Sequence, residues 1–98
     1  MARQKKTQSK HDVEVRRLAN QYKKQGYEVQ ADVSGFSKPE TFGGYRPDVI
    51  AKNDRERKII EVETIDSVGS TRDLKQQRAF KQVANRSKKT SFSRKIVK

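Results

Sequence analysis

The chain has 98 residues, of which 31% are hydrophobic and 37% charged, and its formal net charge is +12. This length fits one small domain, and the absence of cysteine excludes disulfides and thiolate metal sites. The excess of Lys and Arg favours a polyanionic partner, with nucleic acid first and an anionic membrane surface second.

No apolar run reaches the length that spans a membrane, and no apolar signal segment follows the start of the chain. We therefore expect a cytoplasmic protein. The apolar residues fall into periodic segments, which predicts a folded core in spite of the high charge.

Residues 1–8 are polar and basic and predict a flexible arm in front of a single domain, residues 9–98. Residues 9–12 resemble a capping box, which would begin a helix. Apolar side chains at helical spacing then predict an amphipathic helix over residues 10–25, followed by Gly26 as its terminating residue. The apolar stripe consists of Val15, Leu18, Ala19 and Tyr22.

Three strands are expected next. Residues 27–33 alternate between apolar and polar side chains, and residues 46–52 and 58–64 are rich in β-branched residues. A long loop with three glycines, residues 34–45, separates the first two strands, and long loops of this kind often carry function. A short polar turn, residues 53–57, joins the second strand to the third.

A second capping box opens at Ser70 and predicts a helix that ends near Asn85. Residues 92–97 form a weaker final strand. The order αβββαβ predicts an α/β fold in which an antiparallel meander and a parallel fourth strand make a mixed sheet flanked by helices.

Acidic residues stand inside two of the expected strands. Glu61 and Glu63 share one face of the third strand, and Asp48 lies on the second. If these strands pair, Asp48 lies beside Glu61 or Glu63, and carboxylates at that distance repel unless a cation or protons neutralise them. Oxygen ligands favour Mg²⁺ or Mn²⁺. The alternative is three ordinary strand acids, each matched to a Lys or Arg.

The element order, together with Pro47-Asp48 and Glu61 in its strand, resembles the PD-(D/E)XK nuclease superfamily, in particular the small archaeal-type Holliday junction resolvases. The resemblance implies a restriction-endonuclease-like fold and a metal-dependent DNA endonuclease, with branched or junction DNA as the substrate. It also implies that Asp48, Glu61 and the Val62 carbonyl hold Mg²⁺ or Mn²⁺, with Glu14 of the first helix as support.

The sequence departs from that superfamily at Glu63, where lysine is usual. Glu63 can hold a second metal ion or orient the water, as in some restriction enzymes. A second reading moves the catalytic role to Lys75 or Gln76, since Gln76 precedes Phe80 by one helical turn, similar to a Gln-x-x-x-Tyr element. In a third, the chain is a catalytically inactive nucleic-acid-binding module on the same fold.

Basic residues that flank the acids are expected to contact phosphates without reading sequence. They are Lys38, Arg46, Arg72 and Arg78. Aromatic residues of the glycine-rich loop are either core residues or stacking platforms for bases, and the single histidine, His11, is expected at the surface. DNA is the expected partner, RNA stays open, and a symmetric homodimer would suit two-strand cutting. A basic protein that packs on RNA, with structural acids, is a third alternative.

Overall fold

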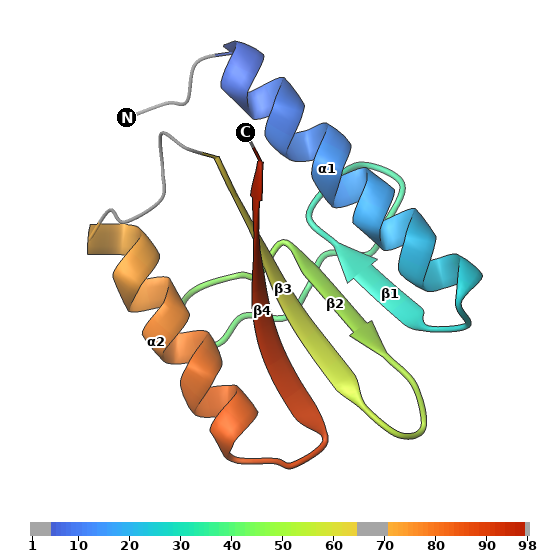
Figure 1. Cartoon of the computed structure of the whole chain (residues 1–98), viewed down its shortest axis with the longest axis vertical. Helices are drawn as coiled ribbons and strands as arrows, with labels where there is room; N and C mark the ends of the chain where they lie inside the picture. Colours follow the sequence, from blue (N-terminus) through green and yellow to red (C-terminus); the bar gives the residue numbers. More distant parts are fainter. Residues whose placement is uncertain (1–4, 65–70, 98) are drawn as a thin grey trace.

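The computed structural model describes residues 5–64 and 71–97, and this part of the chain folds into two helices and four strands (Figure 1). The elements follow the predicted αβββαβ order. In chain order they are α1 (Lys5–Lys24), β1 (Glu28–Ala31), β2 (Val49–Lys52), β3 (Arg57–Thr64), α2 (Thr71–Asn85) and β4 (Thr90–Val97).

The strands form one mixed sheet in the order β1-β2-β3-β4. The first three strands are antiparallel neighbours, and β4 runs parallel to β3. Parallel neighbours cannot be joined by a tight turn, so α2 makes the crossover between them. The predicted meander and parallel fourth strand are both confirmed.

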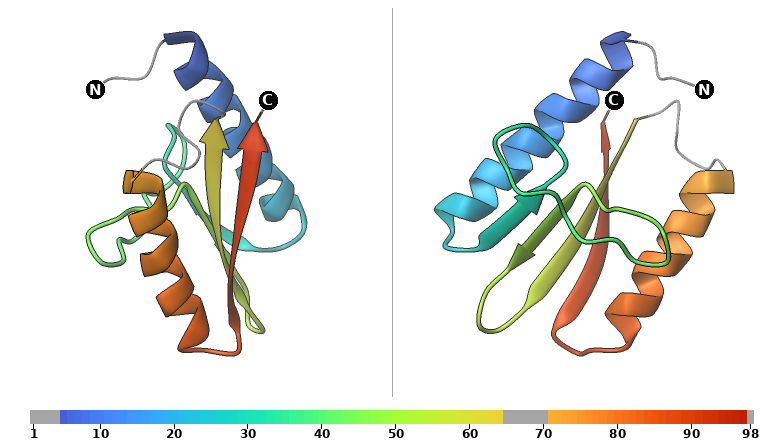
Figure 2. Two further views of the ribbon diagram at one scale, coloured as in Figure 1. Left: turned by 60° about the vertical axis from the view of Figure 1, so that its left-hand side comes forward. Right: turned by 180° about the vertical axis from the view of Figure 1, so that it is seen from behind.

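The two helices cover opposite faces of the sheet (Figure 2). Val15, Leu18 and Ala19 of α1 pack against a face that includes Ile60 and Val62 of β3. The residues of β3 that alternate with Ile60 and Val62 point to the opposite face of the sheet, because successive side chains of a strand point to opposite faces.

The second face is aromatic and lies beneath α2. Phe80 of α2 is fully buried, and its ring centroid lies 5.6 Å from that of Phe92 in β4. Phe92 is the register partner of Ile59, which in turn pairs with Ile50. These four side chains therefore belong to one face, and Glu61 shares it by alternation from Ile59.

The first helix begins earlier than the sequence pattern indicated. It starts at Lys5, so residues 5–8, expected in a flexible arm, are helical, while residues 1–4 lie outside the described residues. The capping box at residues 9–12 was wrong because Lys and Gln favour helix and the chain continues through it. Asp12 contacts the His11 ring, Nδ1 to Oδ1 3.1 Å, within the helix.

Smaller differences concern the remaining ends. The first strand is shorter than the expected 27–33, and β4 begins two residues before the expected 92. The second capping residue, Ser70, lies outside the described residues, and α2 begins directly after it.

The loop between β1 and β2 crosses from one face of the sheet to the other. Phe36 packs against the α1 core, whereas Phe42 meets Phe80 edge to face, with centroids 6.3 Å apart. A Cβ at Gly43 would lie 3.4 Å from the Ala79 Cβ, and the positive φ of 59° there suits glycine. Arg57 stacks on Phe42 at 5.4 Å. Phe36 and Phe42 are thus used in packing rather than held out as stacking platforms.

Truncation of Phe80 tests the second face. Phe80→Ala is expected to lower the free energy of unfolding by about 3–5 kcal/mol, since a buried aromatic ring and its contacts are lost. Urea denaturation followed by circular dichroism measures the change. Leu74→Ala on the same helix, where the side chain is 57% exposed, is the control and should stay within about 0.5 kcal/mol of wild type. Equal losses in both variants would contradict this packing.

Candidate functional site

Asp48 lies immediately before β2, not within it as predicted. Pro47 has no amide hydrogen and cannot extend the ladder, so regular pairing begins one residue after Asp48. The Val62 amide of β3 lies beyond the regular pairing with β2. It donates instead to Asp48 Oδ2, at 2.8 Å. With 8% of the residue exposed, this acid is held inside the protein.

Glu61 lies beside Asp48. The β2–β3 register pairs Val49 with Ile60. One residue earlier in the sequence on the β2 side and one residue later in β3, the same antiparallel register pairs Asp48 with Glu61. Glu61 is 4% exposed, and its carboxyl lies within hydrogen-bonding reach of Asp48. The predicted neighbourhood of these two acids is present in the structure.

Opposing influences act on the pKa of Asp48. Burial is the largest and by itself raises the pKa, but hydrogen bonds with His11, Glu61 and the Val62 amide, with the charge of His11, outweigh it. The net result is a pKa below the ordinary value. Asp48 is therefore poised as an anion, which is the state in which a carboxylate binds a cation.

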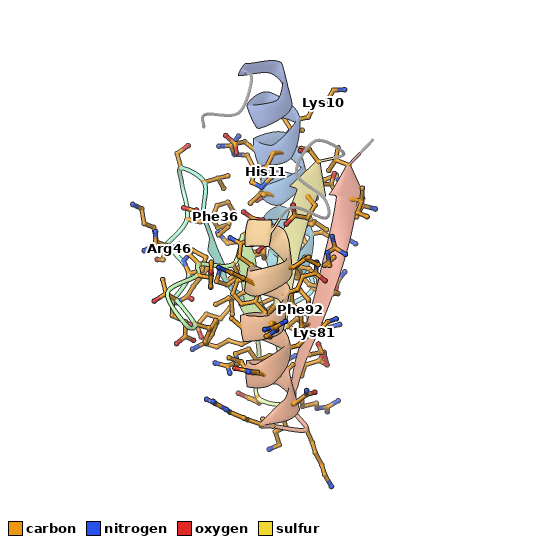
Figure 3. The ribbon with its side chains drawn as sticks, turned by 90° about the vertical axis from the view of Figure 1, so that its left-hand side faces the viewer. Lys10, His11, Phe36, Arg46, Lys81 and Phe92 are labelled. Carbon is orange, nitrogen blue, oxygen red and sulfur yellow. The ribbon has the colours of Figure 1, made fainter. Side chains whose placement is uncertain are left out.

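His11 belongs to this site, and its predicted position at the surface was wrong. It is 6% exposed, and its Nε2 lies 3.2 Å from Asp48 Oδ1. Figure 3 labels His11 on α1. A signal was present in the sequence, because His11 precedes Val15 by four residues and so continues the buried stripe of α1 by one turn. The prediction for His11 was wrong because the capping box at residues 9–12 placed the start of the helix too late.

Glu63 is buried at 4% exposure and shares the face of Glu61 by alternation along β3. Glu14, the predicted supporting acid of the first helix, is engaged elsewhere. Both of its carboxylate oxygens accept bonds from the Arg17 guanidinium, at 3.0 and 2.6 Å. The hydrogen bonds with Arg17 are the largest influence on the pKa of Glu14 and lower it.

None of the other predicted site residues has a contact with Asp48 among those that the structure describes. Gln76 is half-buried one turn before Phe80, while Lys75 beside it is exposed. Lys38, Arg46 and Arg78 are also exposed, and Arg46 Nε donates to the Pro39 carbonyl at 3.1 Å. Figure 3 shows Arg46 on the loop side of the molecule, away from β4. The side chain of Arg72 lies outside the described residues.

The carboxyl groups of Asp48 and Glu61 suit a metal ion that keeps several water ligands. Among the side chains that the structure describes, those of residues 10–64 and 74–97, no group of three or more His, Cys, Asp or Glu residues could hold a metal ion, so the third predicted carboxylate does not complete such a group. Mg²⁺ usually takes one or two carboxylates and completes its octahedron with water and substrate phosphate. Two buried carboxyls in hydrogen-bonding reach, of which Asp48 is held anionic, fit that mode of binding.

A mixed four-stranded sheet between two helices, with buried acids just before β2 and in β3, defines an α/β protein with a restriction-endonuclease-like fold. Residues 2–89 match the family model REase_AHJR-like, so the chain belongs to this AHJR-like family of restriction-endonuclease-like proteins. The family agrees with the predicted PD-(D/E)XK superfamily and suggests a nuclease. A comparison with curated proteins gave no match. Neither described helix is long and apolar enough to cross a membrane.

The lowered pKa of Asp48 has a consequence for stability. A folded pKa below the unfolded value of about 3.8 stabilises the folded chain above that value, and this stabilisation is lost as the pH falls through the folded pKa. The free energy of unfolding of wild type minus that of Asp48→Asn should therefore rise with pH and level off by about pH 5.

Urea denaturation with EDTA, from about pH 2.5 to pH 6, measures this difference. Asp54→Asn, in the exposed turn after β2, controls for removal of one acidic group from a basic protein. A wild-type to Asp48→Asn difference that stays constant over this range would contradict the assigned hydrogen bonds.

Proposed function

We propose that this protein is a metal-dependent nuclease that hydrolyses phosphodiester bonds in DNA. The observation that carries the proposal is the pair of buried carboxyls, Asp48 and Glu61, held side by side in a member of a restriction-endonuclease-like family. Such an arrangement is costly in a small protein unless a cation or proton neutralises it.

Asp48 and Glu61 would hold Mg²⁺ or Mn²⁺, and the earlier resemblance adds the Val62 carbonyl as a further ligand. A bound divalent ion supplies Lewis-acid polarisation of the phosphate and a more acidic water. Within the chain itself, the Val62 amide and His11 fix both oxygens of Asp48. This fixed geometry keeps the carboxylate oriented without a cost at the moment of reaction.

The proposed reaction consumes one water molecule. The water oxygen forms a bond to phosphorus, and the bond from phosphorus to one sugar oxygen breaks with its electron pair on that oxygen. The attacking water gives up a proton and the leaving oxygen gains one, which yields a phosphomonoester and a hydroxyl end. Glu63 and Gln76 are proposed to orient the water or a second ion, with Lys75 as an assisting cation.

DNA is favoured because the chain carries a net charge of +12 and several exposed basic side chains. Lys38, Arg46 and Arg78 are proposed to contact phosphates, as is Arg72. Branched DNA as the preferred substrate rests on the resemblance to resolvases alone, and action on RNA remains an alternative. A homodimer would place two such sites on the two strands of one substrate.

Removal of the first carboxylate tests the nuclease. Asp48→Ala is expected to lower the cleavage rate by at least about 100-fold and to abolish the rise in melting temperature on addition of Mg²⁺, with DNA binding retained. The assay uses labelled duplex, single-stranded and four-way-junction DNA with Mg²⁺, Mn²⁺ or EDTA. Asp54→Ala is the matched control and should cleave at the wild-type rate. Full cleavage by Asp48→Ala would refute the site.

A catalytically inactive nucleic-acid-binding module is the second candidate, because buried Glu63 stands where the superfamily has lysine. This candidate predicts tight DNA binding without cleavage in any metal. It also predicts that the logarithm of the binding constant falls linearly with the logarithm of salt concentration. Binding of wild type at several salt concentrations, beside the cleavage assay, separates the two functions.

A further inference from the structure

The proposed site and its surroundings on β3 bring together three acids and one histidine, His11. Asp48, Glu61 and Glu63 are all buried acids, and the phosphate that would be attacked is itself an anion. Negative charge also grows on the phosphate oxygens as the bond to water forms. A cationic side chain next to the acids would reduce this repulsion, and Glu63 replaces the residue that would have supplied it from β3.

The sheet register brings such a cation from the neighbouring strand. In the parallel β3–β4 pair, Glu61 is the partner of Arg94, and Glu63 is the partner of Ile96. Adjacent strands are about 4.8 Å apart, and register partners point to the same face. The Arg94 side chain is long enough to span that spacing, and the residue is half-buried.

The face is fixed by the packing two residues earlier. Phe92 is the partner of Ile59 and contacts Phe80 of α2, so Arg94, two residues after Phe92, lies on the same side. Arg94 thus stands in line with Glu61 on the face that carries Glu61 and Glu63.

Other basic residues of β3 and β4 are placed differently. Lys95 points to the opposite face, where its charge contributes to the lowered pKa of Glu14. Arg57 stands at the far end of β3, and its Nη1 lies 3.2 Å from Glu40 Oε1 in the β1–β2 loop. The register therefore singles out Arg94 as the candidate beside Glu61.

We propose that Arg94 binds the attacked phosphate and takes over the positive charge that lysine supplies elsewhere in the superfamily; this inference rests on the proposed nuclease function. A guanidinium is always charged and presents a planar set of donors that matches two phosphate oxygens. Its interaction strengthens as charge accumulates on those oxygens, so it acts on the transition state more than on bound substrate.

The test compares Arg94→Gln, which keeps donors but loses the charge, with Arg94→Lys, which keeps the charge. Lys95→Gln is the matched control, since it removes one charge from the adjacent position on the opposite face. With Mg²⁺ and the DNA that wild type cleaves best, Arg94→Gln should lower kcat about 100-fold and change KM much less. Arg94→Lys should regain part of kcat, and Lys95→Gln should stay near wild type.

A second readout needs no cleavage. The Mg²⁺ concentration that gives the half-maximal rise in melting temperature is measured for each variant without DNA. Arg94→Gln should keep or tighten this metal binding, because a positive charge near Glu61 is removed. Melting without metal shows that each variant is folded. Should Arg94→Gln prove unfolded, Arg94→Lys against wild type gives the same comparison, with a fall in kcat at unchanged metal affinity expected.

Each failure has its own signature. Wild type that binds DNA but cleaves none refutes the nuclease and the catalytic Arg94 together. Cleavage by wild type and by folded Arg94→Gln at similar rates overturns the Arg94 assignment alone. Weaker Mg²⁺ binding in Arg94→Gln, in proportion to its loss of kcat, also overturns it, since Arg94 would then act through the ligand Glu61 and not on the phosphate.

Discussion

The carboxylate of Asp48 connects three separate parts of the chain. Its oxygens meet the Val62 amide of β3 and the His11 ring of α1, and Glu61 lies within hydrogen-bonding reach. Pro47 precedes Asp48 and regular pairing begins only at Val49, so the Asp48 side chain takes a place that a backbone carbonyl would hold in a longer strand. The contacts of the Asp48 carboxylate therefore hold this end of the sheet together and also orient the candidate site.

Charge is arranged with opposite signs inside and outside. The chain has a net charge of +12, yet Asp48, Glu61 and Glu63 are almost completely buried. A basic exterior attracts a polyanion over long distances, whereas buried acids act only on what reaches them. In a domain of this size, burial of three acids works against stability. Local departures from folding rules of this kind are typical of functional sites.

The sequence pattern predicted the parts of the structure that depend on local periodicity. A short turn joins β2 to β3, so the sequence could place Asp48 beside Glu61 or Glu63, and the observed register selects Glu61. The start of α1 did not follow, because Lys and Gln form helix without any apolar signal. The pairing of Glu61 with Arg94 was out of reach, since the register of a parallel strand is set by the packing of α2 rather than by a turn.

The place of Glu63 is best understood across the sheet and not along one strand. Residues 61–63 carry Glu63 in place of the lysine that is usual in the superfamily, so this motif has no positive charge. Taken alone, this replacement indicates a nucleic-acid-binding module. Phosphate, however, is recognised by groups that converge in space, whatever elements carry them. Parallel pairing sets Arg94 in line with Glu61 at about one strand spacing. Replacement of lysine in β3 is therefore compatible with catalysis, because the neighbouring strand carries a permanent cation on the same face.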